Sequence, residues 1–347
     1  MNKKRVLSGT RATGKLHLGN YLGAVKGYIA LSEDPEYETF YMVADLHSVN
    51  TPYYPKDFPK KVRSVVLDYL GAGLDPEKCT IFIQSHVPQH IQLFYLLSTQ
   101  VSVARMQHLP TYKEKVKQYP KDVNMALLNY PVLMASDILI YKADAVPVGV
   151  DQLPHLEVAR EVARKMNEKY GTDFPEPEQF KTDGEYVPSL TGEGKMSKSV
   201  EGSYITLVDS LETIKSRLAS TPTDSGKGDI KEGLFFSQES MKEASVPEDL
   251  VPSNGVGSLM KFVELFQGKE KRKEYESQYE GEGVRYGDLK NELSEAIYKH
   301  LEPIQERRKK FEDDPKLVEE ILQGGAQKAR KVAEKTVTEV KAAMGLI

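Results

Sequence analysis

Roughly the first 210 residues alternate between short β-rich apolar runs and longer segments whose apolar residues recur at helical spacing. Such alternation is typical of a parallel sheet whose strands are joined by crossover helices. A mostly helical and polar stretch over 94–130 interrupts it. The pattern predicts an α/β fold, a doubly wound parallel sheet with a helical insertion at about 95–140. Strands are expected at 6–9, 39–45, 80–84 and 145–150, and the main helices at 18–31, 58–70 and 153–170.

The chain changes character after about residue 207. The β-rich runs end there, and 220–231 is rich in the residues that form turns. Charged residues are dense from 261 to the last residue, and Val318, Ile321 and Leu322 recur at helical spacing. We therefore expect a catalytic domain over 1–207 and a helical domain over 208–347.

Composition excludes several classes of protein. No apolar run reaches the ~18 residues that a membrane helix needs, so no membrane partner is expected. The basic N-terminus is followed by too few apolar residues for a secretory signal, which predicts a cytoplasmic protein. The single cysteine, Cys79, rules out an internal disulfide and any zinc or iron–sulfur site made of several cysteines. Because 47 basic residues nearly balance 51 acidic ones, a nucleic acid would need a local basic surface.

A glycine-rich segment, SGTRATGKLHLGNY at 8–21, follows the first predicted strand and opens a helix. The N-terminus of a helix offers unpaired N–H groups and a partial positive charge, which suit phosphate. His17 and Asn20 are three residues apart, so both side chains can reach one phosphate. The segment is not a P-loop, because Leu16 stands where the Mg²⁺-binding Ser or Thr is required. An ordinary glycine-rich turn with a capping histidine is the alternative.

A second segment, GKMSKS at 194–199, lies in a turn-rich stretch. Lys195 and Lys198, with small or flexible residues between them, make a cationic loop that can close on a developing polyphosphate charge. The alternative is a solvated surface turn. Together, HLGN at 17–20 and KMSKS at 195–199 resemble the two signatures of class I aminoacyl-tRNA synthetases, in the same order. That resemblance implies a Rossmann-like catalytic domain and a helical domain that reads the anticodon.

A third segment, YPVLMASDILIY at 130–141, is apolar except for Ser136 and Asp137. A lone carboxylate in such a run is costly unless it is paired. One hypothesis is a helix flank where Asp137 meets water or caps a neighbour. The other is a carboxylate that accepts from a donor-only group in an apolar pocket, and the indole N–H is such a group. This segment, with VGVDQ at 148–152 and PIQER at 303–307, resembles the bacterial type of tryptophanyl-tRNA synthetases.

The resemblance implies an enzyme that makes tryptophanyl-adenylate from L-tryptophan and ATP and then transfers tryptophan to tRNA(Trp). It implies Mg²⁺ held by the ATP phosphates and water, with no metal or iron–sulfur cluster held by the protein, and a homodimer. Catalytic roles would fall to His17, Asn20, Lys195 and Lys198. ATP would be bound by Arg11, Ala12, Thr13, Gly19, Asn20, Gly149, Val150, Asp151, Val187, Lys195, Met196, Ser197, Lys198 and Ser199. Tryptophan would be bound by Asp137, Met134, Tyr130, Gln152, His47 and Val148.

Several alternatives remain open from the sequence. A tyrosyl-tRNA synthetase has a similar architecture but recognises a phenol, which both donates and accepts. A nucleotidylyltransferase and a non-enzymatic tRNA-binding paralogue are further alternatives. Basic stretches at 113–121 and 307–310 are candidates for contact with tRNA, or are merely solvated helix faces. His86 and His90 invite a metal site, but a structural role is favoured because Pro88 separates them and no third ligand is near.

Overall fold

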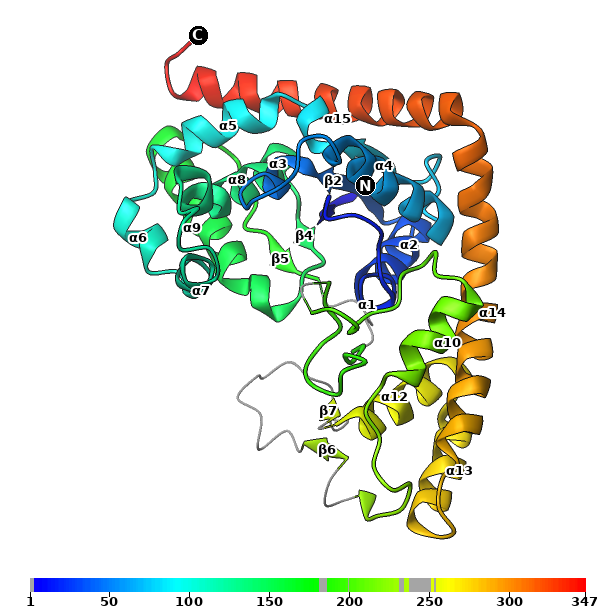
Figure 1. Cartoon of the computed structure of the whole chain (residues 1–347). Helices are drawn as coiled ribbons and strands as arrows, with labels where there is room; N and C mark the ends of the chain where they lie inside the picture. Colours follow the sequence, from blue (N-terminus) through cyan, green and yellow to red (C-terminus); the bar gives the residue numbers. More distant parts are fainter. Residues whose placement is uncertain (1–2, 181–185, 199, 231–233, 237–250, 253) are drawn as a thin grey trace. The chain divides into compact units, whose positions relative to one another are not determined.

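The computed structural model describes residues 3–180, 186–198, 200–230, 234–236, 251–252 and 254–347, and residues 4–179 supply a parallel five-stranded sheet (Figure 1). The spatial order is β3-β2-β1-β4-β5, so the chain builds the sheet outward from β1 in one direction and then in the other. This is the doubly wound topology that the alternating pattern predicts. The strands are β1 (Lys4–Arg11), β2 (Tyr37–Ala44), β3 (Thr80–Ile83), β4 (Ala145–Val146) and β5 (Glu178–Gln179).

The two faces of the sheet bury alternate residues of each strand, as the period of a strand requires. On one face, Leu7, Phe40 and Phe82 join a core that includes side chains of α5, α8, α9 and α15. On the other face, Tyr41 stacks on Tyr28 of α2, with ring centroids 4.7 Å apart, and α4 lies against β2. These helices are α2 (Lys26–Glu33), α4 (Phe58–Ala72), α5 (Gln89–Ser98), α8 (Met125–Ile140), α9 (Leu153–Tyr170) and α15 (Pro315–Ala343).

Short helices fill the connections and the predicted insertion. Asn124 caps the start of α8, because its side chain accepts from the N–H of Leu127. Gly171, with φ 69°, ends α9 in the left-handed conformation that glycine tolerates. The short elements are α3 (Asp45–Ser48), η2 (Gln84–His86), α6 (Val103–Gln107), α7 (Pro110–Gln118) and η3 (Val150–Gln152).

The helix predicted over 18–31 is one continuous helical run, but its middle is a π-helix rather than an α-helix. It begins as α1 (Leu18–Asn20), becomes the π-helix η1 (Tyr21–Val25) and continues as α2. π-Helical turns are rare and often lie beside functional sites. The strand predicted at 145–150 is shorter than expected, because the chain leaves the sheet after Val146 and turns at Gly149 into η3.

Residues beyond 207 are mostly helical, as the apolar spacing predicts. Asn254 caps α12 through the N–H of Gly257, and Asp314 caps α15 through that of Leu317. Helix α15 packs against β3 and α5. The remaining elements are α10 (Leu211–Ala219), β6 (Phe235–Phe236), β7 (Val251–Pro252), α12 (Gly255–Gln267), α13 (Lys269–Glu280) and α14 (Tyr286–Asp313).

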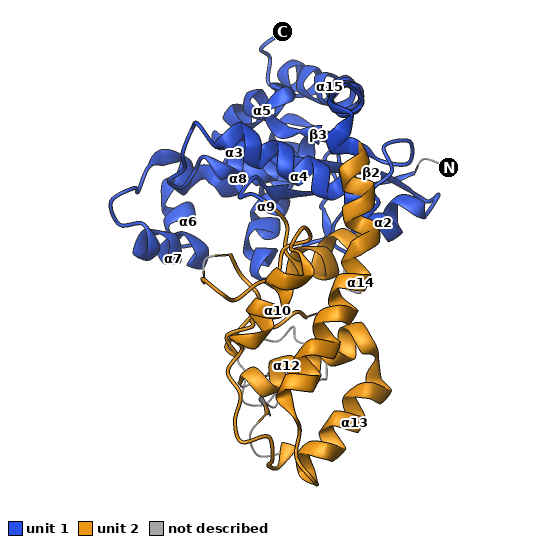
Figure 2. Cartoon of the chain, turned by 45° about the vertical axis from the view of Figure 1, so that its right-hand side comes forward, with its two compact units in different colours: residues 1–14, 28–182, 311–347 blue, residues 15–27, 183–310 orange. Residues whose placement is uncertain are grey.

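The chain packs as two compact units, each made of segments that are distant in sequence (Figure 2). The first unit comprises Met1–Gly14, Tyr28–Thr182 and Phe311–Ile347, and the second comprises Lys15–Gly27 and Asp183–Lys310. The division into functional domains at residue 207 stays a prediction. Within the part of the chain that the structure describes, no helix is both long and apolar enough to cross a bilayer.

Candidate active site

A cavity of about 510 Å³ opens in the first unit beside β1 and the residues that follow β4. Strand order reverses between β1 and β4, and doubly wound sheets bind ligands beyond the carboxyl ends of the strands at such a point. Its apolar walls include Leu7, Met42, Ala44, Leu127, Met134, Ile138, Val146 and Val148. Its polar lining includes Arg11, His47, Thr51, Thr111, Glu114, Lys115, Tyr130, Asp137, Asp151, Gln152 and His155.

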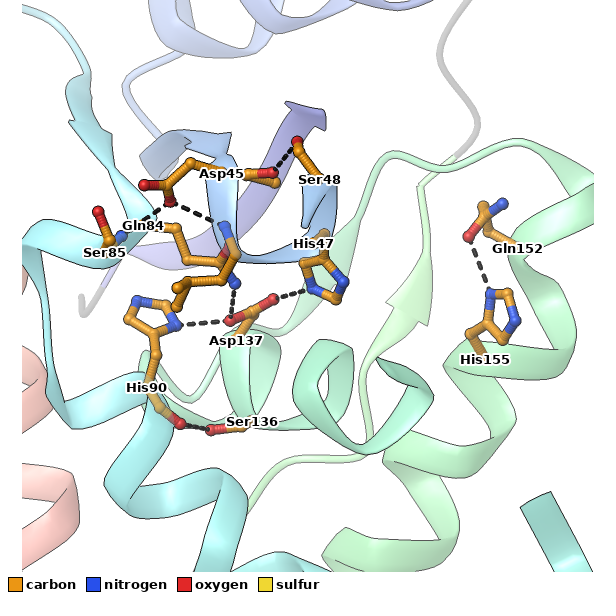
Figure 3. A network of polar contacts seen from close by, with 12 residues as sticks. Asp45, His47, Ser48, Gln84, Ser85, His90, Ser136, Asp137, Gln152 and His155 are labelled. Carbon is orange, nitrogen blue, oxygen red and sulfur yellow. Dashed lines mark hydrogen bonds and ion pairs between the residues drawn. The ribbon is translucent and has the colours of Figure 1, made fainter. Parts of the chain in front are cut away.

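Asp137 lies at the buried end of a hydrogen-bond network that no single segment of sequence contains (Figure 3). Its Oδ1 accepts from Gln84 Nε2 at 2.8 Å and from His90 Nδ1 at 2.6 Å. Its Oδ2 accepts from His47 Nε2 at 2.7 Å. The other nitrogen of His90 is hydrogen-bonded to the hydroxyl of Tyr141 at 2.8 Å. The carboxylate that the sequence singled out is thus paired, but by residues 47 to 90 positions away.

The network leaves the carboxylate one unused acceptor position. A carboxylate offers about four lone-pair sites. Gln84 and His90 occupy two on Oδ1, and His47 occupies one on Oδ2. Burial alone raises the pKa of Asp137, but the hydrogen bonds from His47 and His90 outweigh burial and hold the pKa below its usual value. Asp137 is therefore an ionised acceptor that lines the cavity, and one lone pair of Oδ2 is not used by these three hydrogen bonds.

Gln84 was not among the site residues predicted from the sequence, and a structural role was predicted for His90. The only signal was position: Gln84 follows β3 directly, and side chains just beyond the carboxyl ends of parallel strands lie on the ligand side of such a sheet. His90 is fully buried and holds Asp137, so its role is indeed in the protein framework.

The residues after β4 form the second polar side of the cavity. Gly149 has no Cβ, and a Cβ there would stand 2.6 Å from Oδ1 of Asp151. Glycine at this position therefore avoids a clash that would displace the Asp151 carboxylate. The Oδ2 of Asp151 accepts from Gln152 Nε2 at 2.6 Å. Of the residues predicted here to bind ATP, Asp151 lines the cavity, Gly149 leaves space for its carboxylate, and Val150 begins η3.

Two cations line the same cavity. Arg11 is the last residue of β1, and its Nη2 donates to Thr51 Oγ1 at 2.9 Å. Its Nε is buried and has no hydrogen-bond partner among the described residues. Lys115 comes from the basic stretch that we considered for tRNA, yet it lines the cavity. Burial lowers the pKa of Lys115, and the nearby charge of Arg11 lowers it further. The cavity therefore offers two cationic side chains to a ligand, beside the carboxylates of Glu114, Asp137 and Asp151.

The predicted phosphate signatures lie together in the second unit. His17 caps α1: its Nδ1 accepts from the N–H of Asn20 at 3.3 Å, while the Asn20 side chain accepts from the N–H of His17. Burial, together with the charges of Lys198 and Lys195, lowers the pKa of His17 to about 4. The ring is therefore neutral near pH 7, and because Nδ1 accepts, the proton is on Nε2.

The second signature packs against the first. A Cβ on Gly19 would lie 3.0 Å from the His17 ring and 3.3 Å from Met196 Cβ, so glycine keeps this turn open. The N–H of Met196 donates to the carbonyl of Val187, and Ser203 donates to the carbonyl of Ser197. The structure brings the predicted His17, Gly19, Asn20, Val187 and the lysines into one neighbourhood.

The remaining predicted site residues fall as follows. Ala12 donates its N–H to Ser48 Oγ at 2.7 Å and Thr13 is exposed, and neither lines the cavity. Ser199 lies outside the described residues. Among the described residues, no three His, Cys, Asp or Glu side chains are grouped to hold a metal ion. His47, which the resemblance assigns to tryptophan binding, lines the cavity and donates from Nε2 to Asp137.

Comparison with known proteins identifies the family of the chain. A family model described as class I tRNA synthetases for tryptophan and tyrosine (W and Y) matches residues 1–302. The chain belongs to this family. The chain is 36% identical over 343 residues to the tryptophan–tRNA ligase of Porphyromonas gingivalis, and the match covers 98% of each chain. It is 38% identical over 351 residues to that of Helicobacter pylori, covering 100% of each.

A solved class I synthetase also matches along its whole length. The tryptophanyl-tRNA synthetase of Campylobacter jejuni, crystallised with ADP and tryptophan, has 30% sequence identity and a TM-score of 0.82. The match covers 99% of this chain and 100% of that one. The class I synthetase fold predicted from the sequence is thus confirmed.

Proposed function

We propose that this synthetase is a tryptophan–tRNA ligase, which activates L-tryptophan with ATP, releases pyrophosphate and transfers tryptophan to tRNA(Trp). The observation that carries the proposal is the single acceptor position left on Asp137, which lines the cavity together with the apolar side chains of Met134, Ile138 and Val148. An indole N–H donates and cannot accept, so it matches this position. Met134 and Val148 supply apolar walls for the ring.

The same network argues against the tyrosyl alternative. A phenol hydroxyl can donate to Asp137, but its oxygen then needs a donor in a buried site. His47, Gln84 and His90 each direct one hydrogen at the carboxylate, so these three hydrogens do not serve a phenol oxygen. The relatives with 36% and 38% identity are, moreover, tryptophan–tRNA ligases.

Activation needs positioning and charge stabilisation rather than a general base. The amino acid carboxylate is already ionised at pH 7 and attacks the α-phosphorus of ATP while pyrophosphate leaves. Arg11 and Lys115 neutralise the carboxylate and the phosphate it attacks, and the unpartnered Nε of Arg11 is one available donor. The neutral His17 donates from Nε2, and Lys195 and Lys198 stabilise the charge that develops on pyrophosphate.

The remaining substrate groups are assigned by chemistry. The Asp151 carboxylate accepts from ribose hydroxyls, and Tyr130 and Gln152 meet the ammonium group. Mg²⁺ enters with ATP as part of the substrate and is held by phosphate oxygens and water. A homodimer in the cytoplasm, with 208–347 reading the anticodon of tRNA(Trp), completes the proposal.

ATP–pyrophosphate exchange, measured with each amino acid separately, tests the proposal. We expect exchange with tryptophan and discrimination against phenylalanine and tyrosine of up to ~10⁴-fold, because a buried acceptor without its donor is costly. Exchange that is fastest with tyrosine would overturn the choice of amino acid. Charging of tRNA(Trp) with labelled tryptophan tests the transfer step, and sedimentation tests the homodimer.

A further inference from the structure

His155 is a buried histidine at the start of α9 that no sequence motif pointed to. It is 1% exposed, and both of its ring nitrogens are hydrogen-bonded. Its Nδ1 lies 2.9 Å from Gln152 Oε1 (Figure 3). Its Nε2 lies 2.9 Å from the hydroxyl of Tyr130 and 2.7 Å from that of Thr111. The ring thus links two residues that line the cavity from different helices.

The partners of His155 determine where its proton is. Gln152 donates from Nε2 to the acceptor-only carboxylate of Asp151, so the carbonyl oxygen of its amide faces His155. An amide oxygen only accepts, and Nδ1 must therefore carry the proton. Burial is the main cause that lowers the pKa of His155 to about 4, so the ring is neutral near pH 7 and Nε2 is an acceptor.

This arrangement determines the polarity of Tyr130. A hydroxyl oxygen 2.9 Å from an acceptor nitrogen would repel it unless the hydroxyl proton lay between them. The same reasoning holds for the Thr111 hydroxyl at 2.7 Å, so the one lone pair of Nε2 accepts from both hydroxyls in a three-centre hydrogen bond. With its proton shared in this way, the oxygen of Tyr130 offers lone pairs toward the cavity. The oxygen of Gln152 likewise has a second lone pair. Two acceptors suit an ammonium group, which has three donors and no acceptor.

We propose that His155 is a positioning residue that holds Tyr130 and Gln152 as acceptors for the α-ammonium group of the amino acid. The proposal rests on tryptophan activation as the function. Because the chain of contacts continues to Asp151, the same histidine also ties the orientation of the ammonium site to the carboxylate assigned to ribose.

The test compares ligands that differ only in the ammonium group. In a His155→Phe variant, we expect binding of tryptophan to weaken about tenfold to one-hundredfold, the range for losing a hydrogen bond to a charged group. Binding of indole-3-propionate, which lacks the ammonium, is expected to change less than about threefold by the same reasoning. The ratio of the dissociation constant of indole-3-propionate to that of tryptophan should therefore fall. If His155 had only a structural role, the variant would bind both ligands more weakly by the same factor, and that result would overturn the proposal.

Conservative variants keep the test decisive if His155→Phe does not fold. Glutamine can place its oxygen where Nε2 lies and accept from Tyr130, whereas asparagine is too short. His155→Gln should thus keep a larger ratio than His155→Asn, and equal ratios would refute the assignment. His108 supplies the control, because it is exposed and its ring bonds the Ala104 carbonyl, outside the cavity lining. His108→Gln should leave the ratio unchanged.

The outcome is separable from that of the proposed function. If the wild-type protein does not activate tryptophan, the proposed function fails first. If it does activate tryptophan and the ratio is unaffected by replacing His155, only the positioning role fails.

Discussion

Two adjacent glycines in α15 offer a matched pair of substitutions with opposite expected effects. A Cβ on Gly325 would stand 1.8 Å from the carbonyl oxygen of Ile81 in β3, whereas a Cβ on Gly324 meets nothing within 4 Å. Gly325 is what lets the helix lie against the backbone of the strand. Gly325→Ala should therefore destabilise the first unit, and Gly324→Ala should stabilise it.

The magnitudes follow from the two environments. Alanine is favoured over glycine inside a helix by about 1 kcal/mol, and Gly324→Ala should gain about that amount. Gly325→Ala gains the same, but the helix and β3 must separate by about 1.2 Å before the contact reaches 3.0 Å. Overpacking of this kind costs about 1–3 kcal/mol or more, and the upper end applies because the obstacle is backbone. The expected net loss for Gly325→Ala is about 2 kcal/mol.

Thermal unfolding followed by circular dichroism measures both effects. A domain of about 150–250 residues shifts by roughly 2–4 °C per kcal/mol, so Gly324→Ala should raise the midpoint slightly and Gly325→Ala should lower it by about 4–8 °C. Ile81 precedes Gln84 by three residues, so a displaced β3 should also slow activation through Asp137. A midpoint for Gly325→Ala at or above that of Gly324→Ala would refute the close packing of α15 on β3.

Other predictions concern the site. Asp137→Asn removes the ionised acceptor, so activation should fall about 10²-fold or more and discrimination against phenylalanine should shrink; unchanged discrimination in pyrophosphate exchange would contradict the indole contact. Lys195→Ala and Lys198→Ala should each lower the rate of activation about 10-fold to 10³-fold with little change in tryptophan affinity, and normal single-turnover activation would exclude them. The pKa values of His17 and His155 are lowered to about 4, so only the unfolded chain takes up these protons between pH 6.5 and 4. The free energy of unfolding should therefore decrease as the pH is lowered, by about 2 kcal/mol per histidine from pH 7 to 5. A thermal unfolding midpoint that rises on acidification would contradict this.

The long elements of secondary structure could be predicted because their signals are local. The helix expected at 153–170 is α9 with the same bounds, since its apolar spacing and Gly171 define both the face and the end. The missed elements lack such signals. Strand β5 is the polar pair Glu178–Gln179, which joins the sheet only because β4 offers it an edge. The π-helical turn at Tyr21–Val25 has no periodicity of its own in the sequence.

The candidate site divides in the same way. Asp137 could be identified from the sequence because an unpaired carboxylate in an apolar run is energetically costly. His17 could be grouped with the KMSKS lysines because both segments have phosphate-binding chemistry. Gln84 and His155 could not be predicted, because neither lies in a motif. Their place in the site depends on single hydrogen bonds, from Gln84 to Asp137 and from His155 to Gln152. The sequence also placed Lys115 on a charged surface, since the side of α7 that faces the cavity depends on packing.

The sequence alone thus determined the alternation of strands and helices, the phosphate signatures and the presence of one buried acid, because each depends on neighbours within a few residues. Tertiary structure alone decided which donors surround that acid, how many acceptor positions remain on it, and which way the protons of Tyr130 and His155 point. These properties depend on atoms that are brought within 3 Å from elements dozens of residues apart, and no local pattern encodes such distances.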